Sequence, residues 1–347
     1  MKSQQNHEGI TLLFSDRDAE KVGFNVMKEL TMKLHFTKLI ITTSTIMLLF
    51  IMSMGIAKGD WYPMNSGTTY HVNGIWGSSA ADVFAVDHFG RILHYNSRRW
   101  SIVSNGTLTT LNDICGSSSS DVFAVGFFGT IFHYDGIAWS EMKLGIASDF
   151  WDFWGVWVNS PTDAFAVGTE YFKDNPYLTI WHYNGSIWSA LYNDINVDLN
   201  GVWGSSGDNV FAVGGYLDDQ SKGIIMHYDG NNFTYIFPNT ESLYAIWGCS
   251  SNNVFAVGEN GTILQYNGFI WHEMNSGTDN FLRGVWGTSC NDVFAVGENG
   301  TILHYDGSIW STMNSGTMED LNDVWGSSGN NVFAVGENGT ILQYDGK

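Results

Sequence analysis

The sequence predicts an all-β fold, a seven-bladed β-propeller, from three observations on residues 61–347. A motif anchored by a tryptophan recurs seven times at intervals of about 40 residues, a period typical of propeller blades. A Phe-Ala-Val triplet follows every anchor, and no window after residue 60 shows a sustained helical period. The anchors are Trp76, Cys115 in place of tryptophan, Trp157, Trp203, Trp247, Trp286 and Trp325.

Each copy of the repeat divides into four antiparallel strands, named a to d. Strand a carries the pattern Leu-x-x-Val-Trp-Gly, as at 321–326, and strand b carries the Phe-Ala-Val triplet, as at 331–336. An Asn-Gly pair, a strong hairpin signal, leads into strand c at 340–344. Strand d begins at a tryptophan, as at 310–314. Gly, Asn, Asp and Ser fill the junctions, as turns require.

The seventh copy lacks strand d, and the missing strand is found at the other end of the repeat region. Residues 61–68 read WYPMNSGT and match WSTMNSGT at 310–317. We therefore expect the N-terminal strand to complete the last blade, with Trp61 beside Tyr344. Such closure leaves no open sheet edge in the ring.

Residues before the repeats have the character of a targeting segment. An uncharged run at 39–57 follows Lys33 and Lys38 and ends in Gly55-Ile-Ala57, which suits signal peptidase. A start at Met32 gives a signal peptide over 32–57, so that 1–31 is an upstream mis-assignment. The alternative is an uncleaved signal anchor, with 1–31 as a short cytoplasmic tail. Both interpretations place a propeller of residues 58–347 outside the cytoplasm, secreted or anchored.

Composition argues against several classes of partner and site. The net charge of −20 disfavours nucleic acid, and membrane contact is expected only through the N-terminal segment. Cys115 replaces an anchor tryptophan, while Cys249 and Cys290 follow strand a in neighbouring blades. We expect all three cysteines to stay unpaired, with a Cys249–Cys290 bridge as the alternative. No zinc spacing is present, and no cofactor or metal is expected.

Histidines occupy one repeated slot of strand c, and glutamine takes that slot in two blades. Equivalent positions in different blades lie too far apart to share an ion, so we expect a structural role. The residues are His94, His133, His182, His227, Gln265, His304 and Gln343.

The repeat resembles the Asp-box-like repeats of sialidase-type and photosystem II assembly-factor-type propellers. It is more similar to uncharacterised secreted repeat proteins with Trp-Gly-Ser-Ser and Ala-Val-Gly motifs. The resemblance implies the propeller fold, in which the box is a structural turn. Here the box is one residue shorter from Asp306 to Trp310, with His304 at its leading Ser/Thr position. The arginine clamp of sialidases is not matched, since the arginines after residue 58 are Arg91, Arg98, Arg99 and Arg283.

Three insertions break the regular repeat, at 143–152, 169–177 and 215–222. They fall on d–a and b–c connections, which emerge on the same face of a propeller. We expect exposed aromatic and acidic side chains there to bind a ligand; the alternative is that these loops simply vary. The candidate residues are Trp151, Tyr171, Phe172, Tyr177, Tyr216, Asp218 and Asp219.

The second candidate site is the mouth of the central channel on that same face. It is formed by the residue that follows the first apolar position of each strand a. We expect the amides to hydrogen-bond a ligand, the aromatic rings to stack on it, and the arginine to hold a carboxylate or another anion. The residues are Asn73, Asn112, Trp154, Asn200, Tyr244, Arg283 and Asn322.

These features predict a monomeric, non-catalytic recognition module for a cell-surface glycan or protein. One alternative is a glycan-acting enzyme with its site at the channel mouth, which a pair of carboxylates in a deep pocket would favour. The other alternative is a scaffold that binds no small ligand. The sequence contains no catalytic triad.

Overall fold

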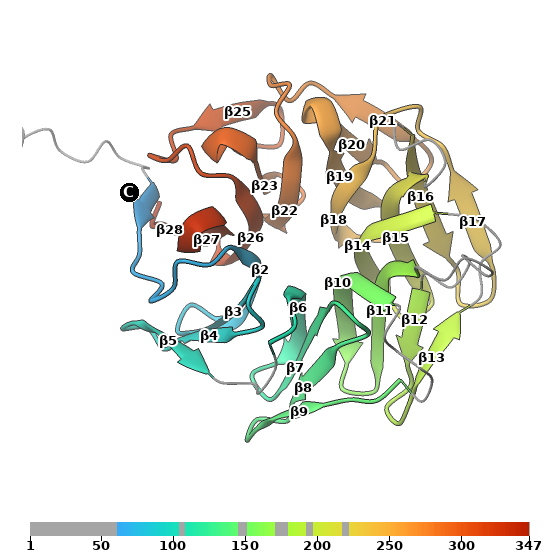
Figure 1. The fold of residues 1–347 in the computed structure, drawn as a ribbon. Coiled ribbons are helices and arrows are strands. Elements are labelled where there is room, and N and C mark those ends of the chain that lie inside the picture. Colours follow the sequence, from blue (N-terminus) through green and yellow to red (C-terminus); the bar gives the residue numbers. More distant parts are fainter. Residues whose placement is uncertain are drawn as a thin grey trace, which may run out of the picture. The chain divides into compact units, whose positions relative to one another are not determined.

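The computed structural model describes residues 61–103, 108–144, 151–170, 180–191, 197–216 and 222–346, within a compact unit over Lys58–Lys347. Seven four-stranded antiparallel sheets surround a central axis as a β-propeller (Figure 1). Strand a of each blade lies innermost. Within the described ranges, no helix has the length and apolar character needed to cross a membrane. The run at 39–57 lies outside those ranges.

The strands have the following bounds. Blade 1 contains β2 (Val72–Ser79), β3 (Asp82–Asp87), β4 (Ile92–Tyr95) and β5 (Trp100–Val103). Blade 2 contains β6 (Leu111–Ser118), β7 (Asp121–Gly126), β8 (Ile131–Tyr134) and β9 (Trp139–Glu141). Blade 3 contains β10 (Trp151–Ser160), β11 (Asp163–Glu170), β12 (Ile180–Tyr183) and β13 (Trp188–Leu191). Blade 4 contains β14 (Val197–Ser206), β15 (Asn209–Tyr216), β16 (Gly223–Tyr228) and β17 (Phe233–Ile236).

The remaining blades follow the same order. Blade 5 contains β18 (Leu243–Ser250), β19 (Asn253–Gly258), β20 (Ile263–Tyr266) and β21 (Trp271–Met274). Blade 6 contains β22 (Leu282–Ser289), β23 (Asp292–Gly297), β24 (Ile302–Tyr305) and β25 (Trp310–Met313). Blade 7 contains β26 (Leu321–Ser328), β27 (Asn331–Gly336), β28 (Ile341–Tyr344) and β1 (Trp61–Pro63). Single 3-10 turns join strands b and c in blades 5 to 7, as η1 (Glu259–Gly261), η2 (Glu298–Gly300) and η3 (Glu337–Gly339).

The predicted ring closure is confirmed. Strand β1 pairs antiparallel with β28, and Trp61 lies opposite Tyr344. The Trp61 ring also meets Phe294 of blade 6 edge-on, with a centroid separation of 6.2 Å. Trp310 makes the same contact with Phe255 of the blade before its own, also at 6.2 Å. The N-terminal strand therefore supplies both the sheet pairing and the inter-blade packing of an ordinary strand d.

The hydrophobic core lies between blades rather than inside one continuous centre. The Phe-Ala-Val strand b is buried in every blade because its two faces pack against neighbouring sheets. One cluster joins Phe333 of blade 7 to Val83, Tyr95 and Trp100 of blade 1. Each blade interface repeats this arrangement, which explains why the triplet does not vary.

The anchor tryptophan of each blade covers a glycine in strand a of the next. A Cβ added to Gly116 would lie 2.8 Å from Cη2 of Trp76, so only glycine fits beneath that ring. Cys115 is the exception, because it replaces the anchor tryptophan. The next blade has Val158 where the other blades have glycine, and Val158 is buried in the cluster against which Cys115 packs. The remaining pairs are Trp157–Gly204, Trp203–Gly248, Trp247–Gly287, Trp286–Gly326 and Trp325–Gly77.

The strand-c histidines each bind the residue that opens strand b of their own blade. His304 Nε2 lies 2.7 Å from Asp292 Oδ1, and the imidazole packs on Phe294 at 4.6 Å between ring centroids. In blade 7, Gln343 Nε2 donates to Asn331 Oδ1 at 2.8 Å. The slot therefore holds a hydrogen-bonded pair. The described residues contain no group of three or more His, Cys, Asp or Glu side chains that could hold a metal.

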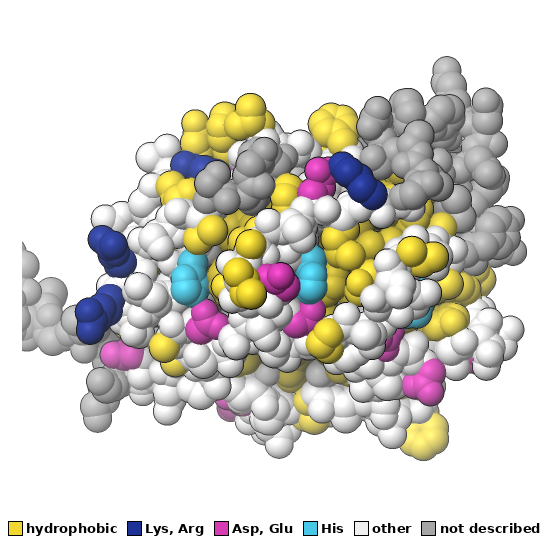
Figure 2. Space-filling model, turned by 90° about the horizontal axis from the view of Figure 1, so that it is seen from below, with side chains coloured by type: hydrophobic (Ala, Val, Ile, Leu, Met, Phe, Trp, Pro, Cys, Tyr) yellow, Lys and Arg dark blue, Asp and Glu magenta, His cyan; other side chains and the backbone are white. Residues whose placement is uncertain are grey.

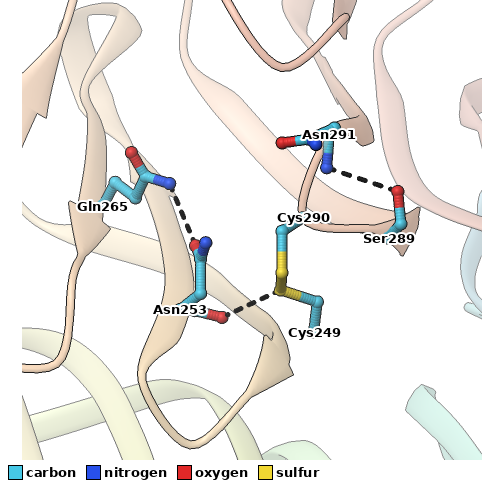
Figure 3. The surroundings of a disulfide bond; sticks show 6 residues. All are labelled: Cys249, Asn253, Gln265, Ser289, Cys290 and Asn291. Carbon is cyan, nitrogen blue, oxygen red and sulfur yellow. Dashed lines mark hydrogen bonds between the residues drawn. A yellow bond between two sulfur atoms is a disulfide. The ribbon is translucent and has the colours of Figure 1, made fainter.

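The expectation that Cys249 and Cys290 stay unpaired is wrong. They form a disulfide between blades 5 and 6, with a Cα–Cα distance of 5.4 Å (Figure 3). The a–b turns of neighbouring blades lie side by side, a proximity that a sequence separation of 41 does not reveal. Cys115 remains a free, half-buried thiol. Burial, with a further contribution from Asp113, raises the pKa of that thiol to about 12.

Candidate functional site

One cavity of about 700 Å³ occupies the mouth of the channel, and all seven predicted mouth residues line it. We call it the mouth cavity, and we call the face with the d–a and b–c connections the mouth face. Residues at the entry of strand a and in the b–c turns complete the lining. These additional residues are His71, His88, Phe127, Asp198, Phe281, Glu298 and Glu337.

The asparagines of the mouth cavity have a role that the sequence analysis did not predict. Each Nδ2 donates to a backbone carbonyl of the following blade, so each amide links two neighbouring blades by a hydrogen bond. One of the two N–H donors of each amide is thereby engaged. Among the described residues, the other donor and the oxygen of Asn73, Asn112 and Asn200 have no further partner, whereas the Asn322 oxygen already accepts from Arg283 Nη1 at 3.3 Å. The contacts are Asn73 to Leu111 at 2.8 Å, Asn112 to Phe153 at 2.7 Å, Asn200 to Leu243 at 2.8 Å and Asn322 to Val72 at 3.0 Å.

Two aromatic side chains replace asparagine in blades 3 and 5. Trp154 Nε1 donates to Thr169 Oγ1 at 3.2 Å, and its ring meets Phe127 edge-on at 5.3 Å. The Tyr244 hydroxyl donates to Glu259 Oε1 at 2.9 Å. Burial and Glu259 together raise the pKa of Tyr244, so this phenol stays neutral. Both rings are held in place before any ligand arrives.

Arg283 replaces asparagine in blade 6, and its charge is already matched. Its Nη2 lies 3.1 Å from Glu298 Oε1 and 3.0 Å from Asp320 Oδ2. Two carboxylates therefore neutralise one guanidinium, which does not favour the expected binding of a ligand carboxylate.

Asp198 is a further acidic residue of the cavity wall. Its Oδ1 atom is buried and has no hydrogen-bond partner among the described residues. Burial, followed by repulsion from Asp152, raises the pKa of Asp198 to about 6. The sequence analysis missed it, although β10 and β14 are both ten residues long, against eight for strand a elsewhere, and these extensions carry Asp152 and Asp198.

The insertion residues divide into three groups. Trp151 is 3% exposed and meets Trp181 edge-on at 5.3 Å, so the expectation of an exposed ligand-binding ring is wrong. The insertion lengthens β10, which pairs with β11 and carries Trp151 into the core. Tyr216, at the end of β15, is half-buried and packs on Phe237 at 5.7 Å. The others, Tyr171, Phe172, Tyr177, Asp218 and Asp219, lie outside the described residues.

A row of exposed aromatic side chains on blades 1 and 2 was not predicted. Tyr70, Phe89 and Phe128, here called the aromatic rim, are 40%, 43% and 60% exposed. Figure 2 views the ring from its edge and shows hydrophobic side chains that project at the top of the view, with another group at its lower right. The signal in the sequence is the b–c turn. It reads Glu-Asn-Gly in blades 5 to 7, but His-Phe-Gly and Phe-Phe-Gly in blades 1 and 2.

Comparisons with known proteins agree with the fold. No protein-family model and no curated protein matches the chain. Among solved structures, YCF48 bound to a D1 peptide has 15% identity and a TM-score of 0.64, covering 82% of this chain and 96% of its own. YCF48 from Cyanidioschyzon merolae has 14% identity and a TM-score of 0.65, covering 82% and 98%. The WD40 propeller domain of Doa1 has 12% identity and a TM-score of 0.66, covering 81% and 94%. These likenesses establish a β-propeller fold.

Proposed function

We propose that this protein is a monomeric, non-catalytic recognition module that binds a segment of another protein at the mouth cavity. The observation that carries the proposal is the mouth cavity itself, where the repeats cease to be alike. Its wall combines fixed aromatic rings, Trp154 and Tyr244, with the carboxyl of Asp198, whose Oδ1 atom has no hydrogen-bond partner among the described residues. Concave sites in which aromatic side chains lie beside convergent polar groups are suited to binding a ligand. The similar YCF48 structure is described with a peptide bound, which accords with this use of a propeller.

The proposal includes a location outside the cytoplasm. The disulfide between Cys249 and Cys290 supports it, because such bonds persist in oxidising compartments and are rare in the cytosol. The uncharged run at 39–57 supports it independently, as a signal peptide or anchor.

A glycan is the alternative ligand, and a glycan-acting enzyme is the alternative function. The specific observation in favour of an enzyme is Asp198, a cavity carboxyl whose raised pKa suits a general acid. Hydrolysis of chromogenic glycosides by the purified protein, abolished in Asp198→Asn, would replace our proposal with this one. A chain that binds nothing at the mouth face would instead be a pure scaffold.

The experiment compares Trp154→Ala with Phe269→Ala on arrays of cell-surface proteins and glycans. Phe269 is 90% exposed in the c–d turn of blade 5, on the opposite face, and is the matched aromatic control. We expect Trp154→Ala to weaken binding by about 1–3 kcal/mol, the usual cost of losing an aromatic anchor, and Phe269→Ala to leave binding unchanged. Melting curves check that both variants are folded. The reverse pattern would refute the mouth face as the binding surface.

A further inference from the structure

We infer that the occupant of the mouth cavity is a cationic peptide segment, with a lysine or arginine side chain beside Asp198 and an apolar side chain on the aromatic rim. This inference rests on the proposed function and names the chemical class of its ligand. Two independent features carry it: the charge balance of the cavity wall and the conformation of the rim.

The cavity wall carries an excess of negative charge. Asp198, Glu298 and Glu337 line it, and Arg283 is the one Lys or Arg side chain among the described lining residues. Arg283 is already bound by Glu298 and by Asp320. Among the described residues, the carboxylate of Glu337 has only a contact of 3.8 Å with the Nδ1 atom of His71. An ammonium or guanidinium group would satisfy these acids, whereas phosphates, acidic glycans and anionic headgroups would be repelled.

Asp198 is where a cation gains most. Its Oδ1 atom is buried without a partner in the described part of the chain. Leaving a buried acceptor unsatisfied is costly, and a charge-assisted hydrogen bond from a ligand would remove that cost. Asp152 lies close enough to repel the charged form of Asp198, and a bound cation would relieve this repulsion as well.

The rim residue Phe128 is held in a conformation that aromatic residues rarely adopt. It takes a φ of 57°, the left-handed region, in a slot where Asn260, Asn299 and Asn338 take 52° to 55°. Asparagine tolerates this region, whereas it is unfavourable for a bulky side chain. Blade 2 nevertheless has phenylalanine there, 60% exposed. Strain kept at an exposed aromatic residue points to a contact with another molecule.

Tyr70 and Phe89 extend the rim onto blade 1 and are ordered by their own contacts. Their rings stack at 4.8 Å with an interplanar angle of 9°. The Arg91 guanidinium lies 4.6 Å from the centre of the Tyr70 ring and is bound by Asp87. Rings fixed in this way lose little entropy when a ligand side chain packs on them.

The rim and the acidic wall are continuous around the ring. Phe128 adjoins Phe127, which contacts Trp154 in blade 3, and Asp198 follows in blade 4. A peptide in extended conformation can therefore place an apolar side chain on the rim and a cationic one in the cavity.

The test measures binding of fluorescent, N-acetylated and C-amidated pentapeptide pools by polarisation. One pool has fixed Phe and Lys, and a second has Glu in place of Lys. The variants are Asp198→Asn and Phe128→Asn; the second installs the residue of blades 5 to 7 and so keeps the turn. Glu273→Gln, at an exposed position of the outermost strand of blade 5, and Phe269→Ala, in the c–d turn on the opposite face, are the matched controls.

We expect the Lys pool to bind at least about tenfold more tightly than the Glu pool, with the preference reduced by added salt. Asp198→Asn should remove most of that preference, Phe128→Asn should weaken the Lys pool about tenfold, and the controls should do neither. Equal binding of the two pools, or a Lys preference that survives Asp198→Asn, would overturn the inference while leaving the recognition function intact. Failure of both pools to bind at millimolar concentration would also overturn it, and the protein and glycan arrays then decide the proposed function separately.

Discussion

Paired polar residues in the strand-c slot show how single positions vary without disturbing the ring. Asp accompanies His in blades 1, 2, 3 and 6, Asn accompanies Gln in blades 5 and 7, and blade 4 combines His227 with Asn209. Burial lowers the pKa of His227, which keeps this imidazole neutral beside a neutral amide. The slot thus requires a donor–acceptor match rather than a particular charge.

This pairing makes His304→Gln/Asp292→Asn a conservative exchange. The double variant reproduces the pair that blade 7 forms between Gln343 and Asn331. We expect its free energy of unfolding to fall within about 1 kcal/mol of the wild type, because the hydrogen bond is retained, and its metal content to be zero. Urea unfolding and elemental analysis provide the measurements. Stoichiometric metal in the wild type that disappears in the variant would contradict a structural role.

Two buried carboxyls on strand a make stability depend on pH. Asp323 Oδ2 accepts from the Ile75 backbone N–H at 2.9 Å, and Asp113 Oδ2 from that of Val156 at 2.8 Å, each in the following blade. Burial raises the pKa of Asp113 from 3.8 to about 6. Burial and then Asp113 raise that of Asp323 well above its ordinary value. Both groups are therefore more easily protonated in the folded chain than in the unfolded one.

Their protonated forms stabilise the fold, and this contribution is complete below about pH 4 and lost as the pH rises through the folded pKa values. We expect the melting temperature to fall between about pH 4 and pH 8, by the equivalent of at most about 3 kcal/mol for Asp113. In Asp113→Asn and Asp323→Asn this slope should flatten, whatever the absolute melting temperature. An unchanged slope in both variants would show that other groups control the pH dependence.

At the scale of the element, the anchor residue of each strand a and the residue that it covers in the next strand a have complementary volumes. Where blade 2 has Cys115 instead of tryptophan, blade 3 has Val158 instead of glycine, and the Val158 backbone N–H hydrogen-bonds the cysteine sulfur. The smaller residue on one side is matched by the larger one on the other. The interface therefore conserves volume rather than residue type.

This predicts strong coupling between the two positions. Cys115→Trp alone should destabilise the protein by about 1–3 kcal/mol or more through overpacking, and Val158→Gly alone by a similar amount through a void and a more flexible backbone. The double variant restores the Trp–Gly pair of the other blades and should recover most of the loss. Urea unfolding of the four proteins closes the thermodynamic cycle. Additive effects would mean that the two side chains are independent.

The strands were predictable because their signals are local, and the site was only partly so. The hairpin at Asn338-Gly339 and the match of 61–68 to 310–317 require no knowledge of tertiary contacts. Trp151 was misassigned because an insertion that lengthens a strand and one that forms a loop both add residues to the repeat, and the sequence does not distinguish them. The Cys249–Cys290 bond, the inter-blade hydrogen bond of Asn112 and the buried Oδ1 atom of Asp198 depend on neighbouring blades, whose proximity the spacing does not encode. Phe128 could have been found from its turn, since an aromatic residue had replaced the asparagine.

For the whole molecule, the ring is closed by a strand from the other end of the repeat region. Trp61 is 4% exposed and Met64 donates its N–H to the Ile341 carbonyl at 2.8 Å, so β1 is part of the core of blade 7. Its removal would expose the edge of β28 and uncover Phe294 of blade 6. A propeller with an open blade loses packing at two interfaces at once.

We therefore expect deletion of residues 58–68 to lower the free energy of unfolding by several kcal/mol, because apolar burial is lost. The deletion should also promote edge-to-edge association. Thermal melts and light scattering measure both effects. A synthetic peptide of residues 61–68 added to the truncated protein should raise its melting temperature, because the peptide binds only the folded ring. A scrambled peptide of the same composition, which cannot place a tryptophan opposite Tyr344, should have no such effect. A truncated protein that melts at the wild-type temperature would show that the six complete blades, with a three-stranded seventh, already form a self-sufficient ring.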